Sequence, residues 1–333
     1  MNLKILFTLA LMLLSVSGWS FTKGFNQAWL KNNYGFQWLD QTYDQKYVED
    51  LMILNKEGGS EILRMWLYEG AGLTQFIYNQ NEGTLKLKPE ILKNLTHFLK
   101  MARKHHLKVN LTFLDGNAFG NFAKNQQLGV FWWNVFNSKY GMLEQFYQAA
   151  IVPIYQLVGQ NFKDVVTQID LVNEVNALIF FGMFEDPKAS MSSFLCKLGH
   201  HRPVAVTASL GWLDAEARFF EGILSNSCLD FYDIHLYNDF GAIPRCTDFQ
   251  RLSNQGHIFQ LGEFGQKSQS YDDNLQAQVT SNFLNSAKNC GFKSALAWRL
   301  DDNREGYNTE ARHSYMAFGA ARKGYYIFRD FLE

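Results

Sequence analysis

Short apolar segments alternate with amphipathic segments from residue 21 to the end of this 333-residue chain, and this alternation constrains the fold more than any other feature. Apolar, β-branched runs predict strands, and apolar residues at helical spacing predict the helices between them. The expected strands are Phe21–Asn26, Glu61–Trp66, Lys108–Leu114, Val165–Val172, Pro203–Ser209, Phe231–His235, His257–Glu263 and Ser294–Leu300. The expected helices are Asp44–Glu57, Pro89–His106, Lys139–Val158, Asp186–Leu198, Ala215–Leu224, a short one near Phe249–Leu252, Asn274–Asn289 and Ser314–Phe331.

Eight such repeats in one chain predict a single (β/α)₈ barrel that spans residues 21–333. The alternative is an open, doubly wound sheet, which usually carries a glycine-rich phosphate-binding turn. The sequence contains neither GxGxxG nor GxxxxGK, so the barrel is the better prediction. No linker, repeat or low-complexity stretch divides the chain.

Residues 1–20 have the pattern of a secretory signal peptide. Lys4 precedes the apolar run Ile5–Leu14, and small residues follow, including Gly18 and Ser20. The apolar run is too short for a comfortable membrane span, so we expect cleavage after Gly18 or Ser20. The protein would then be extracellular or periplasmic, with no membrane association after cleavage. A retained anchor is the alternative, and no later segment is long and apolar enough to cross a bilayer.

If the protein is exported, its four cysteines are expected to form disulfides, because disulfides form in oxidising compartments. Cys196, Cys228, Cys246 and Cys290 allow three pairings; we favour one that joins Cys196 to Cys228, and unpaired thiols are the alternative. None of the four forms a CxxC motif, so a zinc site is not expected. The net charge of −1 gives no electrostatic basis for binding nucleic acid or an anionic membrane.

Function in a barrel of this kind collects where the strands end, so polar residues at those positions are candidates for a site. The fourth strand ends in Asn173-Glu174, and the seventh ends in Glu263. A carboxylate at the end of a buried strand is costly unless it is paired or does chemistry. Two glutamates that face each other suit retaining glycoside hydrolysis, in which one attacks the anomeric carbon and the other is acid and then base. We expect the nucleophile's charge to raise the pKa of the acid.

Further polar and aromatic residues lie at or near the ends of other strands. They are Gly24–Asn26 on the first, Arg64 on the second, His235 and Tyr237 on the sixth, and Trp298 on the eighth. With these motifs in this order, the chain resembles the clan A glycoside hydrolases, closest to the cellulase and β-mannanase type of family five. The resemblance covers nearly all of residues 21–333 and implies a carbohydrate substrate.

The resemblance implies two catalytic residues, Glu174 as the acid/base and Glu263 as the nucleophile. The residues that it implies as substrate-binding or supporting are Arg64, Asn173, His235, Tyr237 and Trp298. Asn173 would bind the 2-hydroxyl of the reacting sugar, and Trp298 would lie beneath that sugar. Arg64 and Tyr237 would support the nucleophile.

The chain departs from the family pattern at two strand ends. Val175 follows Glu174 where the family usually has proline. Asp115 and Asn117 occupy the end of the third strand, where many members have histidine, so the contacts of that histidine are not carried over.

The aromatic content of 16% supports a sugar ligand, because the C–H faces of sugar rings stack on aromatic rings. Aromatic residues crowd the segment after the third strand: Phe119, Phe122, Phe131, Trp132, Trp133 and Phe136. We expect several of them to line a cleft for a polysaccharide or oligosaccharide and others to pack in the core. Trp132 and Trp133 would divide between the two environments.

These observations predict a secreted, monomeric, retaining β-glycosidase that cleaves internal linkages of β-linked mannan or glucan and needs no metal or cofactor. One rival is a carbohydrate-binding barrel without catalysis, although a binding protein has no need of both glutamates. Another rival is a transglycosylase that uses the same residues with a sugar acceptor in place of water.

Overall fold

Parallel strands form a central barrel in the computed structural model. The model describes residues 21–28, 39, 42–69, 75–79, 84–120, 127–211, 228–267, 272–300, 313–317 and 319–332. The strand order is β7-β6-β5-β2-β1-β11-β10-β9-β8. The bounds are β1 Thr22–Asn26, β2 Ile62–Glu69, β5 Lys108–Asp115, β6 Val166–Asn173, β7 Ala205–Thr207, β8 Ser209–Leu210, β9 Tyr232–Tyr237, β10 Phe259–Gly265 and β11 Ser294–Ala297.

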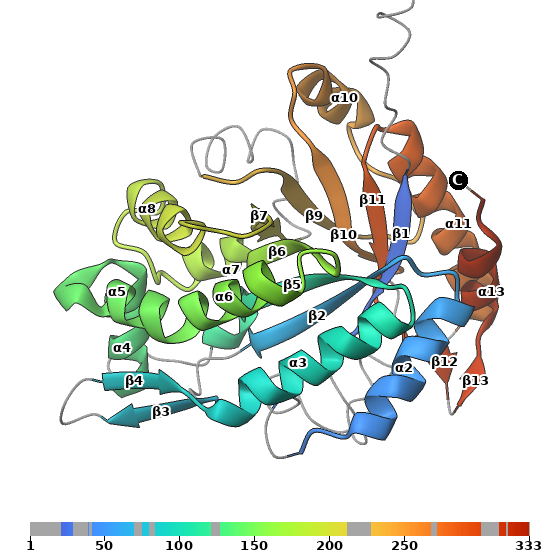
Figure 1. Ribbon diagram of the computed structural model, residues 1–333. Helices are drawn as coiled ribbons and strands as arrows, with labels where there is room; N and C mark the ends of the chain where they lie inside the picture. Colours follow the sequence, from blue (N-terminus) through green and yellow to red (C-terminus); the bar gives the residue numbers. More distant parts are fainter. Residues whose placement is uncertain are drawn as a thin grey trace, which may run out of the picture.

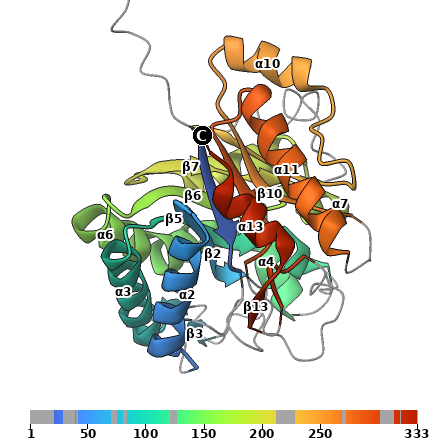
Figure 2. The same cartoon turned by 90° about the vertical axis from the view of Figure 1, so that its right-hand side faces the viewer.

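The expected (β/α)₈ barrel is confirmed, because β7 and β8 are two halves of one strand. Only Ala208 separates them; β7 pairs with β6, and β8 pairs with β9. This fifth strand therefore joins the two sides of the sheet and closes it. Figures 1 and 2 show the helices on the outside of the barrel. Their bounds are α2 Gln45–Glu57, α3 Pro89–Lys104, α4 Gln127–Phe136, α5 Met142–Phe146, α6 Val152–Asn161, α7 Val175–Phe180, α8 Ala189–Leu198, α10 Cys246–Asn254, α11 Asp273–Asn289 and α13 Lys323–Asp330.

Helix α3 illustrates how the sequence sets these outer elements. Pro89 is its first residue, where the missing N–H costs no hydrogen bond. Ile91, Leu95 and Phe98 are buried on the face that packs on the barrel. Basic residues in the last turn complement the helix dipole, and the helix ends at Lys104.

The expected helix Lys139–Val158 is interrupted. A 3₁₀ turn, η3 (Lys139–Gly141), precedes α5, and a π-helical turn, η4 (Tyr147–Ile151), separates α5 from α6. Pro153 stands near the start of α6 and cannot donate a backbone hydrogen bond, so the preceding turn widens.

The expected helix Ser314–Phe331 is wrong in its first half. A two-stranded ribbon, β12 (Met316–Ala317) and β13 (Ala320–Ala321), precedes the shorter helix α13. Gly319, between the two strands, has φ +79°, which favours glycine and ends helical periodicity. A second ribbon, β3 (Phe76–Asn79) with β4 (Thr84–Leu87), was not expected. The expected signal peptide and the expected helix Ala215–Leu224 lie outside the described residues.

Two disulfides tie outer elements together. Cys196 pairs with Cys228, as expected, and Cys246 pairs with Cys290. The first joins α8 to the segment before β9, and the second joins α10 to the end of α11. Within the described part of the chain, no helix is long and apolar enough to cross a membrane.

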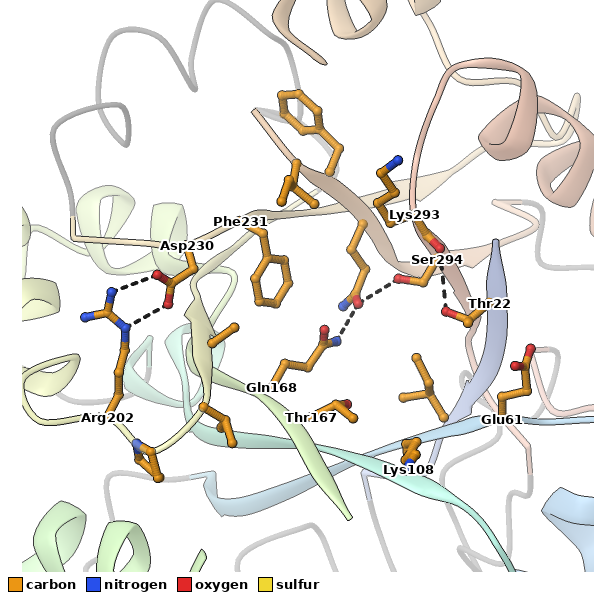
Figure 3. A pocket seen from close by; sticks show the side chains of 17 residues that line it. Thr22, Glu61, Lys108, Thr167, Gln168, Arg202, Asp230, Phe231, Lys293 and Ser294 are labelled. Atoms are coloured by element: carbon orange, nitrogen blue, oxygen red, sulfur yellow. Dashed lines mark hydrogen bonds and ion pairs between the residues drawn. The ribbon is translucent and has the colours of Figure 1, made fainter. Parts of the chain in front are cut away.

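A cavity of about 760 Å³ opens at the end of the barrel where the strands begin (Figure 3). Its lining includes the first or second residues of several strands, such as Thr22, Lys108 and Ser294. Gln260 accepts a hydrogen bond from Ser294 (2.8 Å) and another from Gln168. This end of a barrel serves stability, and the strand ends that carry Glu174 and Glu263 lie at the other end.

Candidate active site

Arg64 on β2 is the centre of a buried network at the carboxyl ends of the strands. Its Nη1 donates to Oε1 of Glu263 (2.7 Å) and to Oδ1 of Asn26 (2.8 Å). Its Nη2 donates to Oδ2 of Asp170 (2.6 Å) and to Oδ1 of Asn173 (2.8 Å). The guanidinium therefore fixes four groups from three other strands, β1, β6 and β10, in one arrangement. Burial alone would lower the pKa of Arg64, but the surrounding carboxylates outweigh it and raise that pKa, so Arg64 stays charged.

Glu263 on β10 lies over this arginine and is 5% exposed at its side chain. The hydroxyl of Tyr237 donates to its Oε2 (2.7 Å), while Arg64 holds its Oε1. The pairing of β10 with β9 shifts register between Leu261 and Glu263, a bulge of the kind found next to active sites. A Cβ on Gly262 would lie 1.9 Å from Oδ1 of Asp233, so only glycine fits in this bulge.

Glu174 follows the last residue of β6, next to Asn173. Its φ of +48° and ψ of 56° are left-handed, which is uncommon for a residue with a side chain and typical of functional sites. The hydroxyl of Ser209 on β8 accepts from its backbone N–H (2.8 Å). Nδ1 of His235 lies 3.1 Å from Oε1 of Glu174 and 3.5 Å from Oε2 of Glu263, so the imidazole bridges the two carboxyl groups.

Val175, where the resemblance noted from the sequence suggested proline, is the first residue of α7 and is fully buried. Proline is favoured at that helical position because its N–H is not needed there. Valine also begins the helix there, and the position of Glu174 does not depend on proline.

The pKa directions of the two glutamates differ from the expectation. Burial raises the pKa of Glu174, but the hydrogen bond and charge of His235, the amide of Asn117 and the charge of Arg64 outweigh burial and lower it. Burial raises the pKa of Glu263, the charges of His235 and Arg64 oppose that effect, and the net pKa is raised. The charge of Glu174 thus raises the pKa of Glu263 rather than the reverse. Burial dominates at Glu263, whereas at Glu174 the contact of His235 and the amide of Asn117 outweigh burial. The carboxylates in turn raise the pKa of His235 against its own burial.

Three buried acids in the network were not assigned a site role from the sequence. Asp170 on β6 pairs with Arg64, Asp233 on β9 accepts from Gln260 (2.8 Å), and Asp115 on β5 accepts from Asn173 (2.9 Å). Burial raises the pKa of both Asp115 and Asp233 to about 7. A charged residue within an otherwise apolar strand, as in Ile169-Asp170-Leu171, is the sequence signal that could have identified them, because such a charge must be paired.

Trp298 follows β11 and packs against Trp66, with ring centroids 5.7 Å apart; Tyr237 contacts the same group. Arg64 lies below the ring of Trp66, 5.7 Å from its centroid. Trp298 is 5% exposed and therefore forms a wall of the network rather than an isolated surface platform. All seven residues expected at the site thus come together at one end of the barrel.

The described aromatic residues after β5 mostly pack in the core, which was expected of some of them. Phe119, Trp132 and Phe136 are fully buried and meet in edge-to-face and stacked contacts. Trp133 is half-buried, so the two tryptophans do divide between environments. Phe180, at the end of α7, is 86% exposed. Phe122 lies outside the described residues.

Glu174, His235 and Glu263 each offer one ligand atom, and these atoms lie within 4.8 Å of one another. That spacing also suits a metal ion. However, Arg64 and Tyr237 already donate to Glu263, and Asn117 donates to Oε2 of Glu174 (2.6 Å). With His235 on Oε1 of Glu174, each of the four carboxylate oxygens has a hydrogen-bonding neighbour, and we interpret the cluster as an acid–base centre.

No protein-family model matches the sequence. No curated protein matches it either. Many solved structures have a similar fold. Endo-1,4-β-mannanase from Eisenia fetida is 18% identical, with a TM-score of 0.64 over 94% of this chain and 92% of that one. β-Mannanase from the blue mussel Mytilus edulis is 16% identical, with a TM-score of 0.63 over 91% and 94%.

A GH5_18 protein from Streptomyces cattleya, solved in complex with Manβ1-4GlcNAc, is 10% identical, with a TM-score of 0.71 over 93% of this chain and 80% of that one. Identities this low establish the fold and leave the activity to be argued from the site. The chain has the (β/α)₈ barrel fold of these mannanases.

Proposed function

We propose that this protein is a secreted, retaining β-glycoside hydrolase that acts on β-linked mannan or glucan, with mannan the better candidate. The observation that carries the proposal is the pair of carboxyl groups. One oxygen of Glu174 and one of Glu263 lie within 4.8 Å of each other, and each carboxyl has its own set of donors. Retaining glycosidases have carboxyl groups roughly 5–5.5 Å apart, which leaves no room for a water between nucleophile and sugar.

In the proposed first step, one carboxylate oxygen of Glu263 attacks the anomeric carbon, while Arg64 or Tyr237 keeps its hydrogen bond to the other oxygen. Glu174 gives its proton to the glycosidic oxygen, which leaves with the electron pair of the broken C–O bond. In the second step, Glu174 takes a proton from water, and the water oxygen attacks the anomeric carbon and expels Glu263. The carboxylates of the network stabilise the positive charge that develops on the sugar between these states.

The supporting residues act on the same two groups. Arg64 and Tyr237 hold both oxygens of Glu263, so the nucleophile has one orientation. Asn173 is itself fixed by Arg64 and Asp115, as a ligand of the 2-hydroxyl would need to be. Trp298 would lie beneath the reacting sugar. Two disulfides support export, and the mannanase names of structural neighbours support mannan as the substrate.

One polysaccharide panel tests the function. Galactomannan, glucomannan, carboxymethyl cellulose and a β-1,3-glucan are incubated with the mature protein, and new reducing ends are counted. We expect release from mannan or glucan, with products of retained β configuration by NMR in the first minutes. Binding without release across the panel would favour a carbohydrate-binding barrel. Longer products at high acceptor concentration would favour a transglycosylase, and inverted products would contradict the mechanism.

Replacing His235 with glutamine is expected to shift the whole pH profile of kcat/KM upward by about 1 pH unit or more. The charge of His235 lowers the pKa of both glutamates, so its loss favours their protonated forms. The active form needs Glu263 ionised and Glu174 protonated. Because Glu174 has the lower pKa and Glu263 the higher one, the pKa of Glu174 sets the acidic limb and that of Glu263 sets the basic limb. Both limbs therefore move to higher pH. The control is His97→Gln on α3, which removes a half-buried histidine bonded to Tyr43 and should leave the pH profile unchanged. An unchanged pH profile in His235→Gln would contradict this account.

A further inference from the structure

The end of β5 is hydrogen-bonded to the end of β6 and packs closely against it. Oδ1 of Asp115 accepts from Nδ2 of Asn173 (2.9 Å) and from the backbone N–H of Asn117 (3.1 Å). Gly116 lies so close to β6 that a Cβ there would be 2.4 Å from the carbonyl oxygen of Glu174. The 3₁₀ turn η2 (Gly116–Phe119) begins at this contact and fixes the direction of the Asn117 side chain.

Asn117 uses that position to hold the carboxyl group of Glu174. Its Nδ2 donates to Oε2 at 2.6 Å, and His235 lies on the other oxygen, Oε1. Asn117 is exposed, so it contributes little to the core. An amide N–H can only donate, so this bond requires a lone pair on Oε2. The carbonyl oxygen of a carboxylic acid is a better acceptor than its hydroxyl oxygen, so the bond from Asn117 to Oε2 favours the proton of Glu174 on Oε1.

Resting on the proposed function of Glu174, we propose that Asn117 is a positioning residue that holds one orientation of the Glu174 carboxyl and reserves Oε1 for proton transfer. In the first step the O–H bond at Oε1 breaks, its electron pair stays on the carboxylate, and the proton goes to the leaving oxygen. In the second step Oε1 takes a proton from the attacking water. Asn117 donates to Oε2 whether Glu174 is protonated or ionised, so the carboxyl group keeps one orientation.

The other groups that face Glu174 come from the neighbouring strands. His235 (β9) contacts it directly, Glu263 (β10) and Arg64 (β2) act through charge, and Asp115 (β5) acts through Asn173 and charge. A substitution at 117 leaves all four in place. Asn117 therefore has an effect that can be separated from theirs.

Two variants separate the lost donor from an added charge. Asn117→Ala removes the donor, and Asn117→Asp keeps the shape but faces Oε2 with an oxygen. We expect both to shift the acidic limb of kcat/KM upward by about 1 pH unit, because the carboxylate of Glu174, whose lower pKa sets that limb, loses a stabilising bond. We expect kcat on substrates with poor leaving groups to fall by about tenfold or more, with a larger loss for Asn117→Asp. Asn285→Asp, which also removes an exposed amide donor but lies on the outer helix α11, should match the wild type.

A measurement without turnover keeps this proposal separate from the proposed function. The ¹³C-labelled carboxyl of Glu174, assigned by its loss in Glu174→Gln, is titrated by NMR in each variant. A raised titration midpoint in both Asn117 variants, together with the kinetic losses, supports the proposal. An unchanged midpoint, or a raised midpoint with wild-type kcat and pH profile, overturns it. A wild type inactive on every glycan would instead refute the hydrolase function, whatever the titration gives.

Discussion

Replacing Glu263 with glutamine is expected to lower kcat on an activated aryl β-mannoside or β-glucoside by about 10⁴-fold or more. Glutamine cannot form the glycosyl ester that retention requires, and its neutral amide does not stabilise positive charge on the sugar. The loss should be the same for good and poor leaving groups, because both need the nucleophile. Steady-state rates with two aryl glycosides of different leaving-group pKa measure it.

The fold should survive this substitution. The carbonyl oxygen of glutamine can accept from Arg64, and its amide can donate to the Tyr237 hydroxyl, which is able to accept as well as donate. An unchanged Tm therefore checks that the loss is chemical. Glu61→Gln is the matched control, because Glu61 lines the cavity at the opposite end of the barrel. Wild-type turnover in Glu263→Gln would refute the assignment of the nucleophile.

The barrel could be predicted because each strand is a local pattern with a clear end. Runs such as Val165–Val172 are short and rich in β-branched residues, which favours a strand, and the polar pair Asn173-Glu174 follows at once. The prediction for the segment after Ser314 was wrong because its local pattern is ambiguous. Its apolar spacing fits a helix, and Gly319 was the one signal for the ribbon of β12 and β13 that precedes α13.

The residues of the site could be predicted from the sequence, whereas the directions of their pKa shifts could not. Residues at strand ends must meet at the barrel mouth, so Glu174, Glu263 and Arg64 could be grouped from the sequence. Which carboxyl has the higher pKa depends on burial and on the hydrogen bonds that each one receives, and no spacing in the sequence fixes these. The contact from Asn117 to Glu174 joins positions 57 residues apart and depends on the close approach of Gly116, which is also a three-dimensional fact.

Aromatic residues show the same limit. Phe119, Trp132 and Phe136 have a composition that suits sugar binding, yet they pack on one another beneath the surface. A cluster of rings buries a large apolar area wherever it meets itself, and composition does not say whether a ring faces a cleft or a neighbour. Only burial distinguishes the two uses.

Removing the side chain of Glu174 should give a different defect from the loss of Glu263. With a dinitrophenyl glycoside the leaving group needs no proton, so Glu174→Ala should form the glycosyl-enzyme at a rate near that of the wild type. Hydrolysis of that intermediate needs the base and should slow by about 100-fold or more, so a burst of dinitrophenol precedes a slow steady state. With a poor leaving group the first step should slow as well.

Rescue by azide then identifies the face of the sugar ring on which each carboxyl group acts. In Glu174→Ala the small anion can occupy the space of the lost carboxyl, beside His235 and Asn117, and it needs no base to attack. It should restore turnover and give the β-glycosyl azide, because it attacks the ester from the side that water uses. In Glu263→Ala azide should enter from the nucleophile's side and give the α-glycosyl azide. The two anomers would assign the roles independently of any rate, and an α-azide from Glu174→Ala would reverse them.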